Sequence, residues 1–400
     1  MRLERVWLTD FRSHAELSVD LSDGLTAVIG ANGSGKTNLL EAIGVLSRLK
    51  SFRGAPNERM IRRGCERAIV RAEGVRDDRP VLIEIELGPG RSTVMVNRQR
   101  LQKNRDLLGA LRVTVFAPDD LALVKEGPAV RREFLDDLMV ALDPRNDALL
   151  ADYARTVKQR NTLLKQVRGK LDEGAELTLD VYDGQLSGLG TRITYLREHV
   201  LEALMPRVAQ AYGILADAEV SVVANYRRSW DSDDMAQDVH NQRSTDVARS
   251  TTSVGPHRDE VGLRIDGFDS RGEASQGEQR TLALALRFAG HELVTEHVGE
   301  APLLLLDDVL SELDDGRATA LLSNLPGGQT IITSATDLPE LVAPELILRF
   351  PPSVVDTSPN STVVDNSVDS VQRAVEIGAG ESAVDDAPGA SGLPQRSSEV

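Results

Sequence analysis

The glycine-rich segment at residues 30–37 has the residue types and the spacing of a phosphate-binding loop. It fits the pattern G-x-x-x-x-G-K-S/T, and the apolar run at residues 25–29 supplies the strand that such a loop follows. Glycines let the backbone N–H groups point inward at phosphate oxygens, and the helix expected after the loop presents its positive end to them. The segment predicts binding of a nucleoside triphosphate; the plainer alternative is an ordinary glycine-rich turn between a strand and a helix.

Two side chains of this loop carry its chemistry. Lys36 would neutralise phosphate charge and take part in catalysis, and Thr37 would offer its hydroxyl to Mg²⁺. We expect the Lys36 side chain to be exposed, so that its replacement leaves the core intact. The residues predicted to bind the nucleotide here are Gly30, Ala31, Asn32, Gly33, Ser34, Gly35, Lys36, Thr37 and Asn38.

A second chemical motif lies far downstream, where four leucines at residues 303–306 are followed by Asp307 and Asp308. Such a run predicts a buried parallel strand whose carboxyl end faces the active site. Asp307 would then hold Mg²⁺ through its water shell, and Asp308 would orient or deprotonate the attacking water. The motif is weak alone and strong beside a phosphate loop. The wide separation, together with the absence of the base-reading N-K-x-D of GTPases, predicts an ATPase core split by a large insertion.

Charge is unevenly distributed along the 400 residues, whose formal net charge is −16. Residues 351–400 hold eight acids and two bases, and their composition predicts a disordered acidic tail. Residues 48–105 hold fifteen Lys or Arg and seven Asp or Glu, which indicates a phosphate-binding face or, equally, a plain solvated basic surface. With one cysteine and no long apolar run, we expect a cytoplasmic protein without disulfides or membrane spans.

Hydrophobic periodicity predicts an α/β fold interrupted by helices. We expect strands at 3–8, 17–21, 113–116 and 261–265, a hairpin from 81–87 and 94–96, a helix at 38–49, long helical segments over about 130–211 and a mobile connection over 229–250. The predicted domains are the N-terminal part of an ATPase head (1–118), a helical arm (119–248), the C-terminal part of the head (249–350) and the tail (351–400).

A serine and a glycine at an expected helix start, within residues 274–280, precede the second motif, and residues 311–314 follow it. This arrangement resembles the signature and D-loop of ABC-type ATPases, in which the signature of one subunit completes the nucleotide site of another. Ser275 and the backbone of Gly277 are suited to capping a γ-phosphate, while the simpler alternative is an S-x-G helix cap. The resemblance assigns Ser275, Gln276 and Gly277 to ATP binding.

Finer matches make the sequence similar to the RecF family of recombination-repair proteins. They lie at residues 10–12, 36–42, 51–53, 116–121, 131–136, 159–164 and 255–259, so the resemblance covers roughly residues 1–350. It implies an ABC-type (Rad50/SMC-like) P-loop ATPase head split by a short helical arm. It also implies slow ATP hydrolysis coupled to formation of an ATP-dependent homodimer on double-stranded DNA, with RecR and RecO as partners at gapped DNA and at single-strand/double-strand junctions.

Three positions depart from the common ABC pattern. Ala274 replaces the usual signature leucine, Glu278 stands where glutamine is common, and Asp308 is shorter than the glutamate of most ABC enzymes. A shorter carboxylate would hold water less well, which fits a slow switch better than a motor.

Further expectations concern residues around the motifs. Arg12 would contact phosphates as its counterpart does in related heads, or be a surface arginine. Thr333 or Ser334 is our candidate for sensing the γ-phosphate, and the turn at residues 118–120 is the region expected to hold the Q-loop.

Two other matched segments have competing interpretations. Residues 255–259 would shape the nucleotide site or the dimer interface, or else form a tight turn with a buried ion pair. Arg131 and Arg132 are expected to stabilise the helical arm rather than to touch DNA.

Three functions compete on these observations. The leading prediction is an ATP-gated clamp that holds duplex phosphates without reading sequence and releases them on hydrolysis. An alternative is an ATP-dependent nuclease of the overcoming-lysogenisation-defect type, which needs a further acidic metal-binding domain that the tail is too simple to form. The third is the nucleotide-binding subunit of a transporter, which the helical insertion and the basic hairpin region disfavour.

Overall fold

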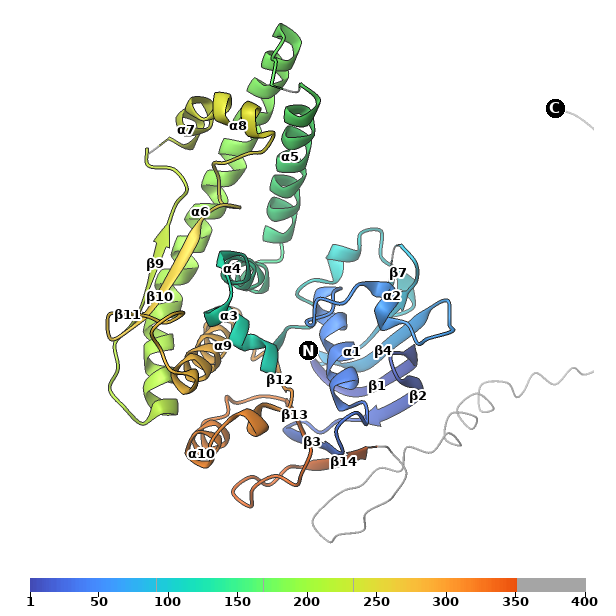
Figure 1. The fold of residues 1–400 in the computed structure, drawn as a ribbon. Coiled ribbons are helices and arrows are strands. Elements are labelled where there is room, and N and C mark those ends of the chain that lie inside the picture. Colours follow the sequence, from blue (N-terminus) through green and yellow to red (C-terminus); the bar gives the residue numbers. More distant parts are fainter. Residues whose placement is uncertain (91, 168, 233, 351–400) are drawn as a thin grey trace, which may run out of the picture.

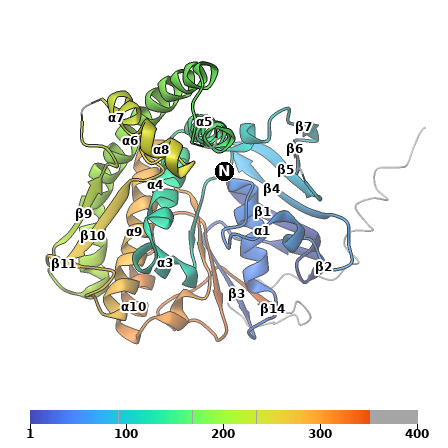
Figure 2. The same cartoon turned by 45° about the horizontal axis from the view of Figure 1, so that its top comes forward.

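The computed structural model describes residues 1–350 apart from positions 91, 168 and 233, and the predicted disordered tail at residues 351–400 lies outside the described residues. Figure 1 shows a pair of long helices that extends away from the sheets. In Figure 2, two lobes lie side by side, one containing β1, β2, β4 and α1 and the other containing β9, β10, α6 and α9.

A parallel sheet positions the two chemical motifs. Its order is β14-β3-β13-β12-β8, and its strands are β3 (Leu25–Gly30), β8 (Val113–Phe116), β12 (Leu303–Leu306), β13 (Thr330–Ser334) and β14 (Leu346–Phe350). All four leucines of β12 are buried, so the expected strand is confirmed. Because parallel strands share one carboxyl edge, the loop after β3 and the acids after β12 leave the sheet at the same side.

An antiparallel sheet forms most of the N-terminal lobe. It has the order β2-β1-β4-β5-β6-β7, with β1 (Arg2–Phe11), β2 (His14–Asp20), β4 (Ala68–Arg76), β5 (Arg79–Leu87), β6 (Thr93–Val96) and β7 (Gln99–Arg100). The predicted hairpin is confirmed, with Ile83 opposite Val96 and Ile85 opposite Val94. Alternate residues of these strands share one core with α1 (Lys36–Arg48), which anchors the helix that follows the phosphate loop.

Three helices build the arm, as the helical pattern predicted: α4 (Pro128–Leu142), α5 (Asn146–Gln166) and α6 (Glu173–Ala216). Asp172 caps α6 by accepting a hydrogen bond of 2.8 Å from the Ala175 N–H. Buried apolar residues recur every seven positions along α6, at Leu179, Leu186, Ile193 and Val200. This stripe holds one face of α6 against its neighbours.

The segment predicted as a mobile connection, residues 229–250, instead contains two short helices, α7 (Met235–Asn241) and α8 (Arg243–Arg249). The prediction was wrong because the polar composition hid two apolar anchors. Met235 and Val239 lie four residues apart and are buried in a small core that also holds Trp230.

The strand β9 (Val222–Arg227) was missed; it lies within the predicted helical arm (119–248), after the helical segments that were expected to end at about residue 211. It is one edge of a three-stranded sheet, β11-β10-β9, with the confirmed strand β10 (Glu260–Ile265) and the short β11 (Phe268–Asp269). The β9–β10 pairing joins the segment predicted as the arm to the segment predicted as the C-terminal head. The division of the chain at residues 118 and 248 stays a prediction.

The C-terminal lobe is completed by α9 (Gln276–Val298), which shares a core with α6, α4 and the parallel sheet, and by α10 (Asp315–Ser323). The remaining short elements are α2 (Asn57–Met60), α3 (Ala122–Lys125) and 3-10 turns at Asn104–Leu107, Pro118–Leu121 and Val309–Glu312. Within the described part of the chain, helices of the length and apolarity needed to cross a bilayer do not occur.

Candidate functional site

The predicted phosphate loop curls between β3 and α1. Gly33 and Gly35 have φ angles of 83° and 103°, in the left-handed region that glycine tolerates without strain. Gly35 is also the residue before α1, and a Cβ there would lie 2.6 Å from the His14 ring. Both the backbone geometry and the space around Gly35 therefore require glycine at this position.

Lys36 is buried, with 6% of its surface exposed, so our expectation of an exposed side chain was wrong. Its Nζ donates hydrogen bonds to the carbonyls of Gly30, at 2.6 Å, and Ala31, at 3.1 Å. Side chains at a helix start point back toward the N-terminus, which places this ammonium group inside the loop. Ser34 Oγ is also shielded from water and has no hydrogen-bond partner among the described residues.

Thr37 and Asp307 meet as the two motifs require. Thr37 Oγ1 donates to Asp307 Oδ1 at 2.8 Å, and Thr333 Oγ1 donates to the same oxygen at 3.0 Å. Burial raises the pKa of Asp307, while the hydrogen bonds from Thr37 and Thr333 act in the opposite direction. Mg²⁺ binds oxygen ligands, so a hydroxyl and a carboxylate oxygen this close together are suitable to hold the ion.

Asp308 follows in an unusual backbone conformation, with φ 49°, in the left-handed region that aspartate tolerates better than most residues. Its N–H donates to Thr333 Oγ1 at 2.9 Å. Its carboxylate makes no hydrogen bond or ion pair with the described residues, so it is available to a ligand. Thr333 thus contacts both acids of the motif, and its role as a sensor stays a prediction, as does that of Ser334.

Arg12 is partly buried and is paired with Glu41, a fully buried residue of α1. Its Nε donates to Glu41 Oε2 at 2.7 Å, and its Nη1 donates to the Arg59 carbonyl at 2.8 Å. These contacts give Arg12 a structural role. Its predicted contact with phosphate stays a prediction.

Two neighbours of Arg12 were missed by the sequence reasoning. Ser13 Oγ accepts a hydrogen bond of 2.8 Å from the Asn38 side chain, and His14 Nε2 lies 3.1 Å from the Gly35 carbonyl. Burial lowers the pKa of His14, which favours a neutral ring that donates to this carbonyl. The turn between β1 and β2 therefore supports the phosphate loop from outside.

The signature residues start α9, and Ser275 forms a capping box with Glu278. The Ser275 N–H donates to Glu278 Oε2 at 2.7 Å, so the helix-cap interpretation holds for this serine. Ser275 and Gln276 are exposed and make no hydrogen bond with residues 30–38 within the described chain. Their assignment to ATP binding, like that of Gly277, stays a prediction.

The turn at residues 118–120, expected to hold the Q-loop, is a structural junction. Asp120 accepts a hydrogen bond from the Ala117 N–H at 2.9 Å and pairs with Arg287 of α9 at 2.6 Å. Although burial opposes the charge of Arg287, Asp120 keeps the pKa of this guanidinium raised.

Residues 255–259 pack on the arm. Asp259 is buried and accepts hydrogen bonds from the Tyr226 hydroxyl at 2.6 Å and the Ser229 N–H at 2.9 Å. One interpretation of residues 255–259 was a tight turn with a buried ion pair; the structure has these hydrogen bonds to Asp259 in its place. Arg131 bonds to Glu260 at 2.9 Å and Arg132 to the Asp259 carbonyl at 2.6 Å. Both arginines stabilise the base of the arm, as expected.

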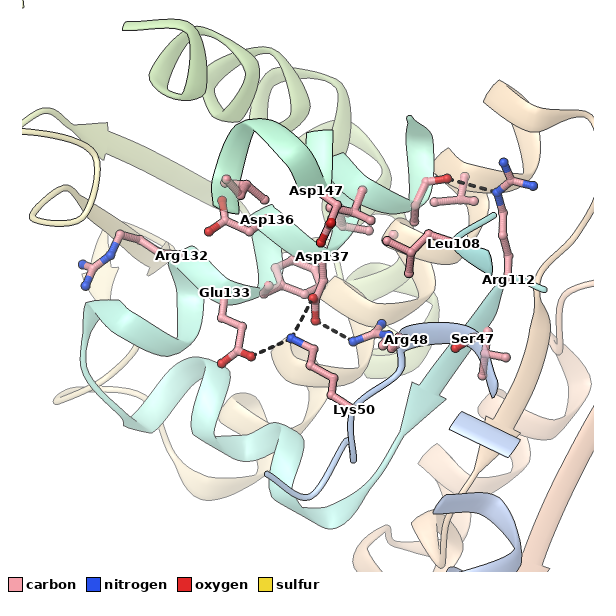
Figure 3. A pocket seen from close by; sticks show the side chains of 18 of the residues that line it. Ser47, Arg48, Lys50, Leu108, Arg112, Arg132, Glu133, Asp136, Asp137 and Asp147 are labelled. Carbon is pink, nitrogen blue, oxygen red and sulfur yellow. Dashed lines mark hydrogen bonds and ion pairs between the residues drawn. The ribbon is translucent and has the colours of Figure 1, made fainter. Parts of the chain in front are cut away.

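A cavity of about 660 Å³ lies between the end of α1 and the arm helices α4 and α5. Figure 3 shows ion pairs along it: Lys50 reaches Glu133 at 2.9 Å and Asp137 at 3.2 Å, and Arg48 also pairs with Asp137. Although burial opposes ionisation, Arg48 and Lys50 lower the pKa of Asp137. The residues of the phosphate loop do not line this cavity, so it is not the nucleotide site.

These ion pairs remove two bases from the predicted phosphate-binding face, because Arg48 and Lys50 bind the arm. Arg62 is likewise paired with Asp10 at 2.7 Å. Exposed bases of this stretch that form no ion pair with the described residues are Arg53, Arg59, Arg63, Arg79, Arg98, Arg100 and Lys103. Among them Arg53 lies near enough to Asp307 for its charge to lower the pKa of that acid.

Comparisons with known proteins agree with this geometry. Residues 2–338 match the family model described as RecF/RecN/SMC N terminal domain. A protein of Frankia alni named "DNA replication and repair protein RecF" is 43% identical over 84% of this chain and 94% of its own, and one of Streptomyces avermitilis with the same name is 39% identical with the same coverage.

Solved structures extend the match. A structure described as "Structure of the recombination mediator protein RecF-ATP in RecFOR pathway" has a TM-score of 0.80 and 30% identity, covering 87% of this chain and 95% of the other. An Smc head domain bound to part of ScpA has a TM-score of 0.52 and 18% identity over 93% of this chain and 100% of its own, which supports the fold alone. The expected ABC-type head fold is therefore confirmed, and the chain belongs to the RecF family.

Proposed function

We propose that this chain is an ATP-dependent DNA-binding protein of DNA replication and recombinational repair. The observation that carries the nucleotide part of the proposal is the hydrogen bond of 2.8 Å between Thr37 and Asp307, which joins the phosphate loop to the acidic motif. The biological part is supported by relatives named for DNA replication and repair, and by RecF with ATP described as a recombination mediator.

The nucleotide in this proposal is ATP with Mg²⁺. Thr37 and Asp307 would hold the ion, which supplies charge neutralisation on the phosphates when bound. The unpartnered Ser34 hydroxyl and the inward ammonium group of Lys36 fit phosphate oxygens at the loop. Asp308, whose carboxylate is not held by described residues, would orient water for slow hydrolysis.

Two copies would close on two ATP molecules. Ser275, Gln276 and Gly277 do not bond to the loop of their own chain, which is consistent with action on the nucleotide of a second copy. Closure with ATP would form a homodimer, and hydrolysis would open it. RecR and RecO are the proposed protein partners, on the basis of family membership and the RecFOR name of the similar structure.

DNA would bind to bases that the protein itself does not neutralise. Arg98, Arg100 and Lys103 are exposed at the β6–β7 edge and the turn after it. Contacts of this kind bind phosphates without reading base sequence and weaken as salt rises. Double-stranded DNA and single-strand/double-strand junctions are the proposed targets.

Fluorescence anisotropy of labelled duplex DNA, titrated with the protein in ATP, in ADP and without nucleotide, tests the proposal. We expect tight binding in ATP alone, loss of that binding in Lys36→Arg, and weakening by salt. Because Lys36 is buried, its substitution could disturb the fold. The circular dichroism spectrum of Lys36→Arg is therefore compared with that of the parent, and the two should match. Equal DNA binding in all three nucleotide states would contradict ATP gating.

The nuclease alternative gains no support from the similar proteins described above, which are named RecF or described as RecF or an Smc head. The transporter alternative likewise has no observation in its favour.

A further inference from the structure

A small cavity lies where the signature helix meets the D-loop. It has a volume of about 330 Å³ and is lined by Gly277 and Arg280 of α9, by Arg317 of α10 and by residues 311–314 between them. It is separate from the phosphate loop of the same chain, because no residue from that loop lines it. Two guanidinium groups therefore share one small space beside the signature.

Arg317 lies directly against Gly277. A Cβ added to Gly277 would be 3.2 Å from Arg317 Nη1 and 3.4 Å from Nη2, so this glycine leaves room for the guanidinium. Arg317 Nη1 donates to Asp314 Oδ2 at 2.6 Å. Arg317 Nε is shielded from water and has no hydrogen-bond partner in the described chain. The guanidinium thus has one acidic partner and unused donor capacity.

Arg280 is held in the same way by the D-loop. Its Nη1 donates to the Glu312 carbonyl at 3.1 Å, and its Nη2 pairs with the Glu312 carboxylate. Each arginine of the cavity is therefore paired with an acid from residues 311–314. Both pairs are at least partly open to solvent, so each can exchange its partner at small cost.

The cavity brings together two kinds of group that bind anions, a helix N-terminus and guanidinium groups. Gly277 lies in the first turn of α9, a helix of 23 residues whose N-terminus carries a positive partial charge. Arg317 adds a positive charge at this end, where cations are unfavourable, and Asp314 and Glu278 balance that charge in the absence of a ligand. A phosphate group would accept hydrogen bonds from the guanidinium in the bidentate geometry that arginine provides.

We propose that Arg317, with Arg280 beside it, binds the terminal phosphate of the ATP held by a second copy of this chain. The inference rests on the proposed ATP-dependent dimer. Asp314 and Glu312 are the partners of the two arginines in the open state, and the phosphate displaces them in the closed state. This exchange frees Glu312 and Asp314 from the two arginines, so the conformation of the D-loop at residues 311–314 depends on the nucleotide of the partner.

Sedimentation of the full chain with and without Mg-ATP tests the assignment. Arg317→Ala should bind ATP as a monomer like the parent and lose ATP-driven dimerisation by about tenfold or more, the effect of one charged hydrogen bond. Arg317→Lys should recover only part of it. Arg264→Ala, which removes an exposed arginine of β10 that forms no ion pair with the described residues, is the control and should behave like the parent.

Asp314→Asn separates phosphate binding from a purely structural role of Arg317. Asparagine can still cap α10, where Asp314 Oδ1 accepts the Arg317 N–H at 3.0 Å, but it loses the ion pair. If the arginine serves the phosphate, this variant dimerises at least as well as the parent. Weaker dimerisation, with unchanged thermal stability, would overturn the exchange.

Mixing two defective proteins tests action in trans. In the proposed dimer, each site combines the phosphate loop of one copy with Arg317 of the other. A dimer of one Lys36→Arg copy and one Arg317→Ala copy therefore has one site in which both groups are intact and one site in which neither is. Recovery of ATP hydrolysis in the mixture supports the assignment, and no recovery overturns it. If the parent itself stays monomeric in ATP, the proposed dimer fails; if the parent and Arg317→Ala dimerise equally, the dimer stands and only the role of Arg317 is wrong.

Discussion

Thr37 donates a hydrogen bond of 2.8 Å to Asp307 although the two residues are 270 positions apart in the sequence. The contact arises because β3 and β12 are separated only by β13 in a parallel sheet, so that both motifs leave its carboxyl edge together. The proposed binding of Mg²⁺ depends on this pair.

The pair predicts that Thr37→Val and Asp307→Asn are not additive. Each variant should lower affinity for ATP by about 10- to 100-fold in Mg²⁺, the usual effect of disturbing a metal ligand or its support. Without Mg²⁺ the loss should be much smaller. Fluorescent ATP titrations of the parent, both single variants and the double variant measure the coupling. Additive losses would mean that the two side chains act independently.

Ser275→Arg should leave ATP binding by the monomer unchanged and abolish ATP-driven dimerisation. Ser275 is exposed at the start of α9, so an arginine there costs its own chain only the cap of the helix, about 1 kcal/mol. The bulk and charge of the arginine would fill the partner's phosphate site. Sedimentation in ATP measures the effect. Thr191→Arg, on the exposed side of α6, is the matched control. Normal dimerisation of Ser275→Arg would make the shared-site model wrong.

Removing Arg98 and Arg100 together should weaken binding of duplex DNA equally for all sequences. For each phosphate that the variant no longer binds, the slope of log affinity against log salt should also fall by about one. Anisotropy titrations at several salt concentrations give both quantities. The control removes Arg145 and Arg155, which are exposed at α5 and already paired with acids. An unchanged salt slope would exclude this edge as the DNA surface.

Arg160→Met should destabilise the arm strongly. Arg160 is fully buried and binds Asp183 and Asp246, both at 2.7 Å. Its removal leaves the buried Asp246 without a cation and leaves Asp183 with Arg243 alone. Breaking a buried pair costs about 3–5 kcal/mol. Arg155→Met, on the exposed side of the same helix, should change stability by no more than about 0.5 kcal/mol. Urea denaturation followed by circular dichroism compares them, and equal midpoints would refute the role of Arg160.

The buried His291 and the half-buried His257 predict loss of stability in acid. Burial lowers the pKa of His257 and of His291 to about 4, from an ordinary value of 6.5. The unfolded chain therefore binds more protons than the folded one, and stability falls as pH decreases from 6.5 toward 4, by up to roughly 3 kcal/mol per histidine. His291→Gln should flatten this dependence in thermal melts. His199→Gln, at an exposed position, serves as the control and should not flatten it.

Local sequence was sufficient for the motifs and for most elements. The phosphate loop, the four leucines before Asp307 and the capping serine of α9 each need particular residue types at fixed spacing, because backbone geometry at those points tolerates few alternatives. The hairpin of β5 and β6 and the arm helices followed from periodicity for the same reason. β9, α7 and α8 were not predicted, because a few buried anchors in polar segments decided them.

The sequence by itself therefore determined the chemical groups, their local backbone and the family of this protein. Only the tertiary structure decided which groups meet: Thr333 with Asp307, His14 with the Gly35 carbonyl, and Lys36 with the carbonyls of its own loop. It also decided that Arg48 and Lys50 bind the arm and that Arg98 and Arg100 stay exposed. Composition counts charges, whereas the partner of each charge depends on contacts between distant segments that no local pattern encodes.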